Sequence, residues 1–443
     1  MSALARILLQ RGFAVSGSSD RATALTARLA EEGARIAIGH AAGHLGDAGT
    51  VVVSTAIDEA NPELAAARDR GVPIVHRGAL LAQLMEGRRG VAIAGTHGKT
   101  TTTAMVARVF ECAGFDPSVA VGGERIDTGT NARSGAGPWF VAESDESDGS
   151  FLELRPEIAV VTNIDNDHVD SDAQFAALIA KFEGFLAALP SHGTAFVGVE
   201  EARAAALAAL PRAARTRTFG FGPSDVRALD VRYAGFGSRS TIVVDGVPLG
   251  ELQLNVPGWI NVLDALPALG IALELGVPFA RASEALAGFP GVRRRFEILS
   301  RGPRMLLVDD YAHHPTAVEA TLAAARAGFS GPIVAAFQPH RYSRTKQLAA
   351  DFARALRGAD VVVLAPVYAA SEAPEPGVDA RTIGEPLRAA GTVVEYVDDV
   401  ADVPEVLLRR APPGAMVLCL GAGSITAAAA RLREALEREP VAP

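Results

Sequence analysis

The chain has little cysteine and no long apolar run. Its two cysteines, Cys112 and Cys419, are far apart in 443 residues and form neither a disulfide framework nor a metal cluster, which fits a reducing compartment. The longest apolar stretch, residues 361–370, contains a proline and is far shorter than the ~20 residues of a membrane helix. Arg6 and Arg11 interrupt the apolar N-terminus, which is unlike a signal peptide. We therefore expect a soluble cytoplasmic protein that does not bind membranes.

An excess of positive charge is also lacking. The 42 lysines and arginines are outnumbered by 51 acidic residues, and the net charge is -9. Such a balance argues against binding to nucleic acid or to anionic membranes, so an anionic substrate would be held by a few local cations. Apolar residues make up 49% of the chain and charged residues 21%, as in globular enzymes. At ~150 residues per domain, the length predicts about three domains. The sequence does not decide between a monomer and a homodimer.

Short β-rich runs alternate with amphipathic segments along the chain, as in parallel sheets covered by helices. We expect an α/β protein of three domains, each with a mainly parallel sheet: residues 1–88, 89–293 and 294–443. The first domain begins with a helix where such a fold would begin with a strand. The expected strands are Phe13–Val15, Arg35–Ala37, Val51–Val53, Pro73–Val75, Val91–Ala94, Trp139–Ala142, Ile158–Val161, Met305–Val308, Ile333–Phe337, Val361–Leu364, Val393–Tyr396 and Met416–Leu420. The expected helices are Ser2–Gln10, Arg21–Glu32, Ala104–Cys112, Ala173–Ala188 and Asn261–Leu275, and residues 230–254 are β-rich.

A glycine- and threonine-rich run lies between the strand at 91–94 and the helix at 104–112. Its order of strand, glycines, Lys-Thr and helix is that of a phosphate-binding loop, although the loop is shorter than G-x-x-x-x-G-K-[ST]. Backbone N–H groups and the helix N-terminus would hold phosphate, Lys99 would reach the β and γ phosphates, and Thr100 would bind Mg²⁺. The alternative is a strand-to-helix turn with an exposed lysine. The loop residues expected to bind ATP are Gly95, Thr96, His97, Gly98, Lys99, Thr100 and Thr101.

Two acidic segments follow the next two expected strands. Residues 142–148 read A-E-S-D-E-S-D, and residues 162–170 read T-N-I-D-N-D-H-V-D. Ligands bind at the carboxyl ends of parallel strands, and clustered carboxylates suit Mg²⁺, so both segments and Thr100 could converge on metal. The alternatives are a solvated acidic turn for the first segment and a structural role for His168.

The third domain has polar motifs after its first two strands. Residues 309–315 read D-D-Y-A-H-H-P, and residues 338–345 read Q-P-H-R-Y-S-R-T. Both are expected at one edge of the sheet. Arg341 and Arg344 lie three apart at a helix start, so both could bind one carboxylate or phosphate. The alternatives are a His-Pro helix entry and solvated surface arginines.

With these motifs the chain resembles the Mur ligases of peptidoglycan synthesis over nearly all of its length. The last three of the matching motifs are typical of the branch that adds L-alanine. The motifs are G-T-H-G-K-T-T-T-T at 95–103, A-E-S-D-E-S-D-G-S-F at 142–151, T-N-I-D-N-D-H at 162–168, R-R-F at 294–296, D-D-Y-A-H-H-P-T at 309–316, Q-P-H-R-Y-S-R-T at 338–345 and V-Y-A-A-S-E-A-P at 367–374.

The resemblance implies a Rossmann-like UDP-sugar-binding domain, a central ATPase domain and a Rossmann-like amino-acid-binding domain. It implies that ATP activates the lactyl carboxylate of UDP-N-acetylmuramate as an acyl phosphate, which L-alanine then attacks. Thr100 and Glu143 would bind one Mg²⁺ and His168 a second. Asn261 would lie at the adenine, Asp310 at the ribose and Arg295 at the phosphates, with Tyr311, His313, Arg341 and Arg344 around the alanine. The expected catalytic set is Lys99, Glu143, His168, Arg341 and Arg344.

The chain also departs from the family pattern. The family has a strand and a glycine-rich loop before the Met-Ser with which this chain starts, so we expect the first domain to be truncated and to bind UDP-sugar weakly. In the family motif P-G-x-H-N-V-L-N, this chain has Ile260 in place of the histidine and Asp264 in place of the last asparagine. Lys181 is a candidate for the carbamylated lysine of related ligases. The alternatives left open are a murein-peptide recycling ligase, a preference for glycine or serine, and a catalytically idle paralogue.

Overall fold

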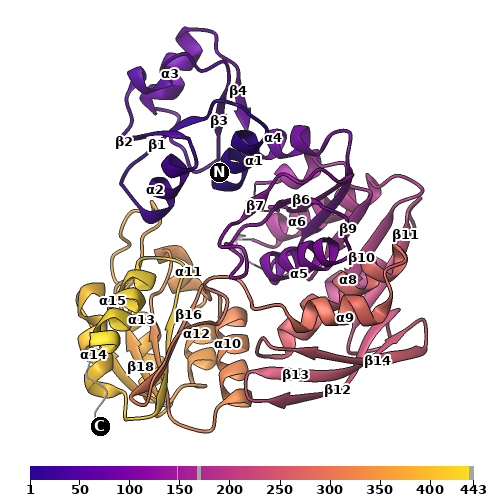
Figure 1. The fold of residues 1–443 in the computed structure, drawn as a ribbon. Coiled ribbons are helices and arrows are strands. Elements are labelled where there is room, and N and C mark those ends of the chain that lie inside the picture. Colours follow the sequence, from indigo (N-terminus) through magenta and orange to yellow (C-terminus); the bar gives the residue numbers. More distant parts are fainter. Residues whose placement is uncertain (147, 167–170, 439–443) are drawn as a thin grey trace. The chain divides into compact units, whose positions relative to one another are not determined.

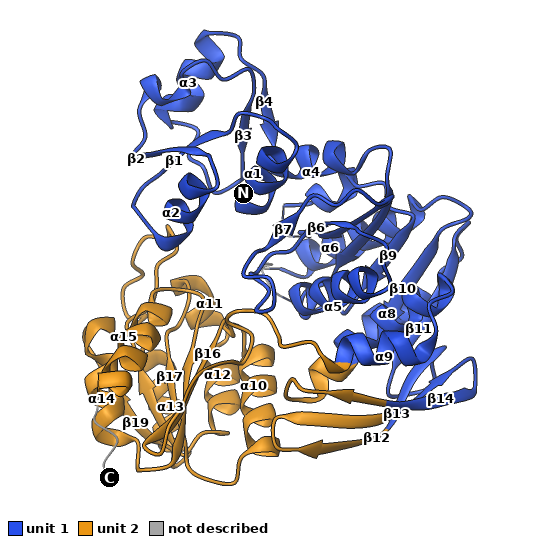
Figure 2. Ribbon diagram, viewed as in Figure 1, with its two compact units in different colours: residues 1–229, 241–251, 263–286 blue, residues 230–240, 252–262, 287–443 orange. Residues whose placement is uncertain are grey.

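The computed structural model describes residues 1–146, 148–166 and 171–438. These residues form two compact units (Figure 2). The first unit comprises residues 1–229, 241–251 and 263–286, and the second comprises residues 230–240, 252–262 and 287–443. Among the described residues, every helix is too short or too polar to cross a bilayer.

The N-terminal segment of the first unit forms two parallel strand pairs, β1–β2 and β3–β4, each covered by short helices (Figure 1). The expected strand at Phe13–Val15 is wrong, because Phe13 is 60% exposed and the strand begins at Ser16 instead. The helix α1 is amphipathic and buries Leu4 and Ile7 in the core of the unit. The elements are α1 Ser2–Gln10, β1 Ser16–Ser19, α2 Ala24–Glu31, β2 Arg35–Ile38, β3 Val51–Val53, α3 Pro62–Asp69, β4 Ile74–His76 and α4 Arg77–Met85.

A ten-stranded sheet follows, in the order β14-β13-β12-β11-β10-β9-β5-β8-β6-β7. Strand β5 lies between β8 and β9 and is parallel to both, so the carboxyl ends of the three strands meet at one edge of the sheet. The elements of this part are β5 Arg89–Ala94, α5 Lys99–Cys112, β6 Ser118–Ala120, β7 Ala132–Arg133, β8 Trp139–Glu143, β9 Ile158–Val161, α6 Asp172–Ala187, β10 Thr194–Gly198, α7 Ala202–Ala208, β11 Arg215–Gly220, β12 Val226–Ala234, β13 Gly237–Val244, β14 Val247–Leu254, α8 Trp259–Glu274 and α9 Phe279–Ala287.

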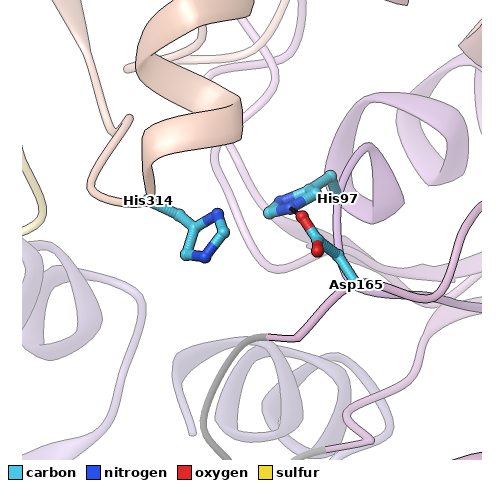
Figure 3. Close-up of side chains that lie close together, drawn as sticks. All are labelled: His97, Asp165 and His314. Carbon is cyan, nitrogen blue, oxygen red and sulfur yellow. Dashed lines mark hydrogen bonds and ion pairs between the residues drawn. The ribbon is translucent and has the colours of Figure 1, made fainter. Parts of the chain in front are cut away.

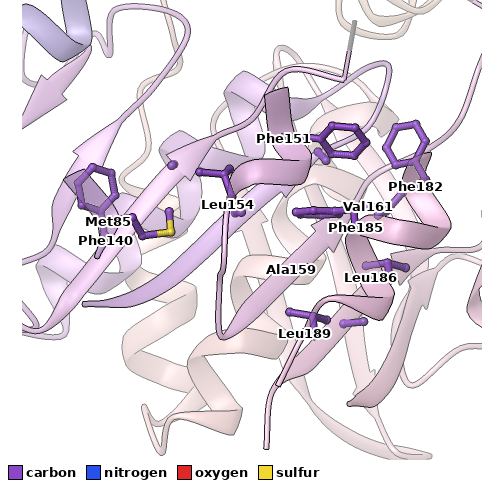
Figure 4. Close-up of a cluster of buried hydrophobic side chains, with 14 of the residues drawn as sticks. Met85, Phe140, Phe151, Leu154, Ala159, Val161, Phe182, Phe185, Leu186 and Leu189 are labelled. Atoms are coloured by element: carbon purple, nitrogen blue, oxygen red, sulfur yellow. The ribbon is translucent and has the colours of Figure 1, made fainter. Parts of the chain in front are cut away.

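An aromatic cluster anchors the segment that follows β8 (Figure 4). The ring of Phe151 lies 5.2 Å from that of Phe182 and 5.0 Å from that of Phe185, both on α6. All three side chains are almost fully buried. Aromatic side chains bury large apolar areas and pack in such tilted arrangements, so Phe151, three residues after the acidic segment 142–148, is held on the core.

Helix α5 begins at Lys99, five residues earlier than expected. The β-branched threonines that precede Ala104 are weak helix formers. In the structure Thr103 Oγ1 donates to the carbonyl oxygen of Lys99 at 2.7 Å, and all four threonines of the run are buried. Packing therefore overrides the low helix propensity of this turn.

The second unit contains a six-stranded sheet in the order β15-β16-β20-β17-β18-β19. The five expected parallel strands are present, and the antiparallel edge strand β15 Glu297–Arg301 was not expected. The other elements are β16 Met305–Asp310, α10 Pro315–Gly328, β17 Ile333–Phe337, α11 Tyr342–Gln347, α12 Ala349–Leu356, β18 Val361–Leu364, α13 Arg381–Ala389, β19 Val393–Tyr396, α14 Val403–Arg410, β20 Ala415–Leu420 and α15 Ile425–Arg438.

Candidate active site

The loop between β5 and α5 depends on two glycines. Gly95 and Gly98 have φ angles of +129° and +82°, which other residues rarely adopt. A Cβ atom on Gly95 would lie 2.1 Å from Thr162 Oγ1, and one on Gly98 would lie 2.3 Å from Asp264 Oδ1. Conformation and lack of space together require glycine at both positions.

The segment that follows β9 fixes the loop from one side. The backbone N–H of Thr96 donates to the Asn163 carbonyl oxygen at 3.1 Å, and that of His97 donates to Asn163 Oδ1 at 2.9 Å. His97 Nε2 lies 3.0 Å from Asp165 Oδ2 (Figure 3). The loop is thus held in place by its neighbouring strand. The predicted ligand His168 lies outside the described residues.

The segment that follows β8 meets the loop from the other side. Thr100 Oγ1 donates to Glu143 Oε1 at 2.9 Å, and the Gly122 N–H donates to Glu143 Oε2 at 2.6 Å. The structure therefore brings together Thr100 and Glu143, two predicted metal ligands. A hydroxyl and a carboxylate are the oxygen ligands that Mg²⁺ prefers, so the pair fits such an ion. Thr101, the next residue of the predicted ATP site, is buried in the first turn of α5.

Lys99 contacts a carboxylate that sequence reasoning did not single out. Its Nζ atom donates to Glu146 Oε1 at 2.9 Å, and also to the carbonyl oxygens of Gly95 and Thr96. Burial raises the pKa of Glu146 to about 7, although the Lys99 ammonium lowers it. The acidic stretch 142–148 was the available signal, but spacing alone does not tell which of its carboxylates points to the loop.

Two further polar groups of the first unit were also missed. Arg77, at the start of α4, donates to Asp145 Oδ2 and Asp148 Oδ2, both at 2.6 Å. Near the ends of β1 and β2, His40 lies 2.8 Å from Ser18 Oγ. Arg77 and His40 come from the segment predicted to bind UDP-sugar, and their sequence signal was their position just after strand ends, whereas Asp145 and Asp148 belong to the acidic segment 142–148.

In the second unit, the first of the predicted site residues along the chain lies in the turn before β15. Arg294 and Phe296 have φ angles of +60° and +49°. The Asp310 carboxylate holds this turn, since it accepts from the N–H groups of Phe296 at 2.6 Å and Ala312 at 2.7 Å. Burial raises the pKa of Asp310, and the nearby Arg295 lowers it. Arg295 itself is exposed, and its guanidinium lies 5.1 Å from the centre of the Tyr311 ring.

Four rings lie in a row at the carboxyl edge of the second sheet. Tyr311 and His313 follow β16, and their ring centres are 5.0 Å apart. His313 lies 5.4 Å from His340, which follows β17 and stacks on Tyr368 at 5.6 Å. The two polar motifs expected at one sheet edge are therefore brought together, and the segment at Tyr368 joins them.

Of the two arginines in the motif at 338–345, Arg341 lies outside the helix in which both were expected. Arg341 has a φ angle of +69° and precedes α11, so the helical spacing argument does not apply to it. Arg344 lies inside the helix, is 6% exposed, and its Nη1 lies 3.4 Å from His340 Nδ1. Asn261, the predicted adenine contact, donates to the Pro257 carbonyl oxygen at 2.6 Å in the first turn of α8. All these residues keep their expected roles as predictions.

Comparison with known proteins defines the class. The model described as "Mur ligase family, catalytic domain" matches residues 1–89, the "Mur ligase middle domain" matches 93–272, and the "Mur ligase, glutamate ligase domain" matches 294–423. The chain belongs to the Mur ligase family.

Individual relatives are similar over nearly their whole length. A UDP-N-acetylmuramate--L-alanine ligase of Geobacter sp. (strain M21) is 45% identical over 430 residues, which cover 96% of this chain and 93% of the relative. The ligase of the same name from Thiobacillus denitrificans is 46% identical and covers 98% and 96%. The crystal structure of the UDP-N-acetylmuramate-alanine ligase of Thermotoga maritima has a TM-score of 0.85 at 30% identity, with 99% of this chain and 96% of that chain covered. A murein peptide ligase of Psychrobacter arcticus shares the fold, with a TM-score of 0.74 at 24% identity over 100% of this chain and 97% of its own.

Proposed function

We propose that this chain joins L-alanine to the lactyl carboxylate of UDP-N-acetylmuramate, with ATP split to ADP and phosphate, in the synthesis of peptidoglycan precursors. The observation that carries the proposal is the similarity of about 45% to L-alanine ligases over almost the full chain. The proposed domains are residues 1–88 for the UDP-sugar, 89–293 for ATP and 294–443 for the amino acid. We place the reaction in the cytoplasm.

The first unit would activate the carboxylate. The loop N–H groups and the α5 N-terminus bind the phosphates of ATP, and Lys99 neutralises charge on the γ phosphoryl group as the lactyl carboxylate attacks it. Thr100 and Glu143 would hold Mg²⁺, which draws the two anionic reactants together and stabilises the developing charge. Attack forms the O–P bond of an acyl phosphate and breaks the bond to ADP. The work of the protein is positioning and electrostatic stabilisation, because no covalent nucleophile is needed.

The second unit would supply the amine. We propose that Arg344 and Arg341 bind the carboxylate of L-alanine, while Tyr311 and His313 line its side of the site. The alanine amine then attacks the acyl carbon, and phosphate leaves from the tetrahedral intermediate. A guanidinium presents two N–H donors to a carboxylate, so it fixes the orientation of the substrate as well as its charge.

The test is phosphate release by the purified chain with ATP, Mg²⁺ and UDP-N-acetylmuramate, to which one acceptor is added at a time. We expect release with L-alanine and far less with glycine, L-serine or a murein tripeptide. Release only with the tripeptide would identify a recycling ligase. No release with any acceptor would identify an idle paralogue and refute the proposal.

A further inference from the structure

Every donor of the Lys99 ammonium is already used within the first unit. An ammonium has three N–H donors. Lys99 Nζ lies within hydrogen-bonding distance of three oxygens: the carbonyls of Gly95 and Thr96 and the Glu146 carboxylate at 2.9 Å. Its side chain is 16% exposed. Before Lys99 can bind a phosphate, at least one of these three acceptors must leave.

Glu146 is the charged acceptor among the three. Its side chain is 8% exposed, and its second oxygen, Oε2, is buried without a hydrogen-bond partner among the described residues. A buried carboxylate with one unpaired oxygen is poorly solvated, so it depends strongly on its ion pair. The pKa raised to about 7 has the same cause, since burial penalises the charged form.

Described residues before and after Glu146 bind helix α4. Arg77 of α4 binds Asp145 and Asp148, the residues one before and two after Glu146. The next residues pack on the same helix, because a Cβ atom on Gly78 would lie 2.2 Å from Ser150 Cβ. The carboxylate is therefore presented to Lys99 by a segment that is tied to the N-terminal part of the unit.

We propose that Glu146 holds the Lys99 ammonium against the phosphate-binding loop until a nucleotide phosphate displaces it, so that Glu146 lowers the affinity of the free chain for nucleotide. The inference rests on the proposed ATP site. Glu146 is a positioning residue, because it acts through Lys99. A nucleotide phosphate displaces the carboxylate because it has more negative charge and more acceptor oxygens, and the exchange costs affinity.

The experiment measures ADP binding to the full chain by titration calorimetry at fixed Mg²⁺. ADP is used because it has the β phosphate that Lys99 should reach and is not consumed. In the variant Glu146→Gln the side chain keeps its shape but loses its charge. We expect its Kd for ADP to fall about tenfold, the equivalent of ~1.4 kcal/mol. The matched control is Glu157→Gln, which breaks an ion pair with Arg89 at the opposite end of β5, and its Kd should equal that of the wild type.

The possible outcomes are distinct. An unchanged or weaker affinity in Glu146→Gln, with the control normal, would overturn the proposal and mean that Glu146 prepares Lys99 for phosphate; the ATP site would stand. Failure of the wild-type chain to bind ADP would overturn the ATP site and this inference with it.

A second measurement needs no variant. The chain has three lysines, Lys99, Lys181 and Lys346, so acetylation by an amine-specific reagent is easily resolved by mass spectrometry. In the nucleotide-free wild type, Lys99 should react at least about tenfold more slowly than Lys346, whose side chain is 61% exposed, because the Lys99 side chain is 16% exposed and its Nζ atom is held by three oxygens. Equal reactivity would overturn the proposal. In Glu146→Gln the reaction of Lys99 should become faster.

Discussion

The variant Gly122→Ala should weaken the proposed Mg²⁺ site and leave the stability of the fold nearly unchanged. The Gly122 N–H donates to Glu143 Oε2, and a Cβ atom on Gly122 would lie 2.6 Å from both oxygens of that carboxylate. Ordinary contact begins at 3.4 Å, so the carboxylate would have to retreat by about 0.8 Å, the difference between 3.4 and 2.6 Å. Its bonds to Gly122 and Thr100 cannot both survive such a shift.

The expected magnitude follows from the bond that is lost. A hydrogen bond to a charged group contributes about 1.5–3 kcal/mol, which is roughly 10- to 150-fold in an equilibrium constant. Changes in groups that orient a metal ligand cost about 10- to 100-fold in metal affinity. We expect the Mg²⁺ concentration for half-maximal phosphate release to rise about 10- to 100-fold. The thermal midpoint should change little, because Gly122 is exposed and its φ angle is not positive.

The assay is the initial rate of phosphate release at increasing Mg²⁺. The control is Gly222→Ala, because Gly222 also donates its N–H to a carboxylate, that of Glu200, while a Cβ atom there would meet nothing within 4 Å. Its Mg²⁺ curve should match the wild type. If the curve of Gly122→Ala also matched it, Glu143 would not bind the metal from this position, and our assignment would be refuted.

Three further variants test other parts of the site. Lys99→Met should lower kcat at least about 100-fold, since it removes a preformed charge at the transferring phosphoryl group; turnover near the wild-type rate would contradict the loop's role. Arg344→Lys should raise the KM for L-alanine about tenfold with the KM for ATP unchanged, because lysine cannot form the two-pronged contact; equal effects on both KM values would contradict this. Burial raises the pKa of Asp309 to about 6 from an ordinary 3.8. Because the buried carboxylate is unfavourable when it is ionised, the free energy of unfolding should fall as pH rises from about 4 through 6. Asparagine cannot ionise, so the free energy of unfolding of Asp309→Asn, measured by denaturant and compared with that of the wild type, should increase by up to about 3 kcal/mol from pH 4 to pH 7.5. The same difference between variant and wild type at both pH values would refute this prediction.

The sequence was a good guide wherever the signal was local. The loop predicted to bind phosphate was identified from a strand, two glycines, Lys99 and a helix that follow one another in the sequence, and the structure has each of these elements. The relation of Thr100 to Glu143 was also expected, because both follow carboxyl ends of parallel strands. The pair Lys99 and Glu146 is different in kind. It depends on which carboxylate of the acidic stretch 142–148 points to the loop, and sequence spacing does not reveal that.

Errors in the sequence analysis arose where local propensity and packing disagree. Phe13–Val15 has the composition of a strand but precedes the real one, since the chain turns at Gly12 with a φ angle of +85° and leaves Phe13 exposed. Helix α5 was expected to begin at Ala104, yet burial of the threonine run and a bond from Thr103 to the backbone make the chain helical from Lys99. Both cases were decided by contacts that single-sequence patterns do not contain.

Asp264 shows how a family position can have a role that the motif alone does not indicate. In the motif, this residue stands where the family pattern has an asparagine. In the structure its Oδ1 accepts from Thr102 Oγ1 at 3.2 Å, and it occupies the space where a side chain at Gly98 would begin. The carboxylate is 5% exposed and packs under the first turn of α5. Because the backbone at Gly98 also needs a positive φ angle, Asp264 and Gly98 together determine the path of the loop into its helix, and so the direction of the N–H groups that are proposed to bind phosphate.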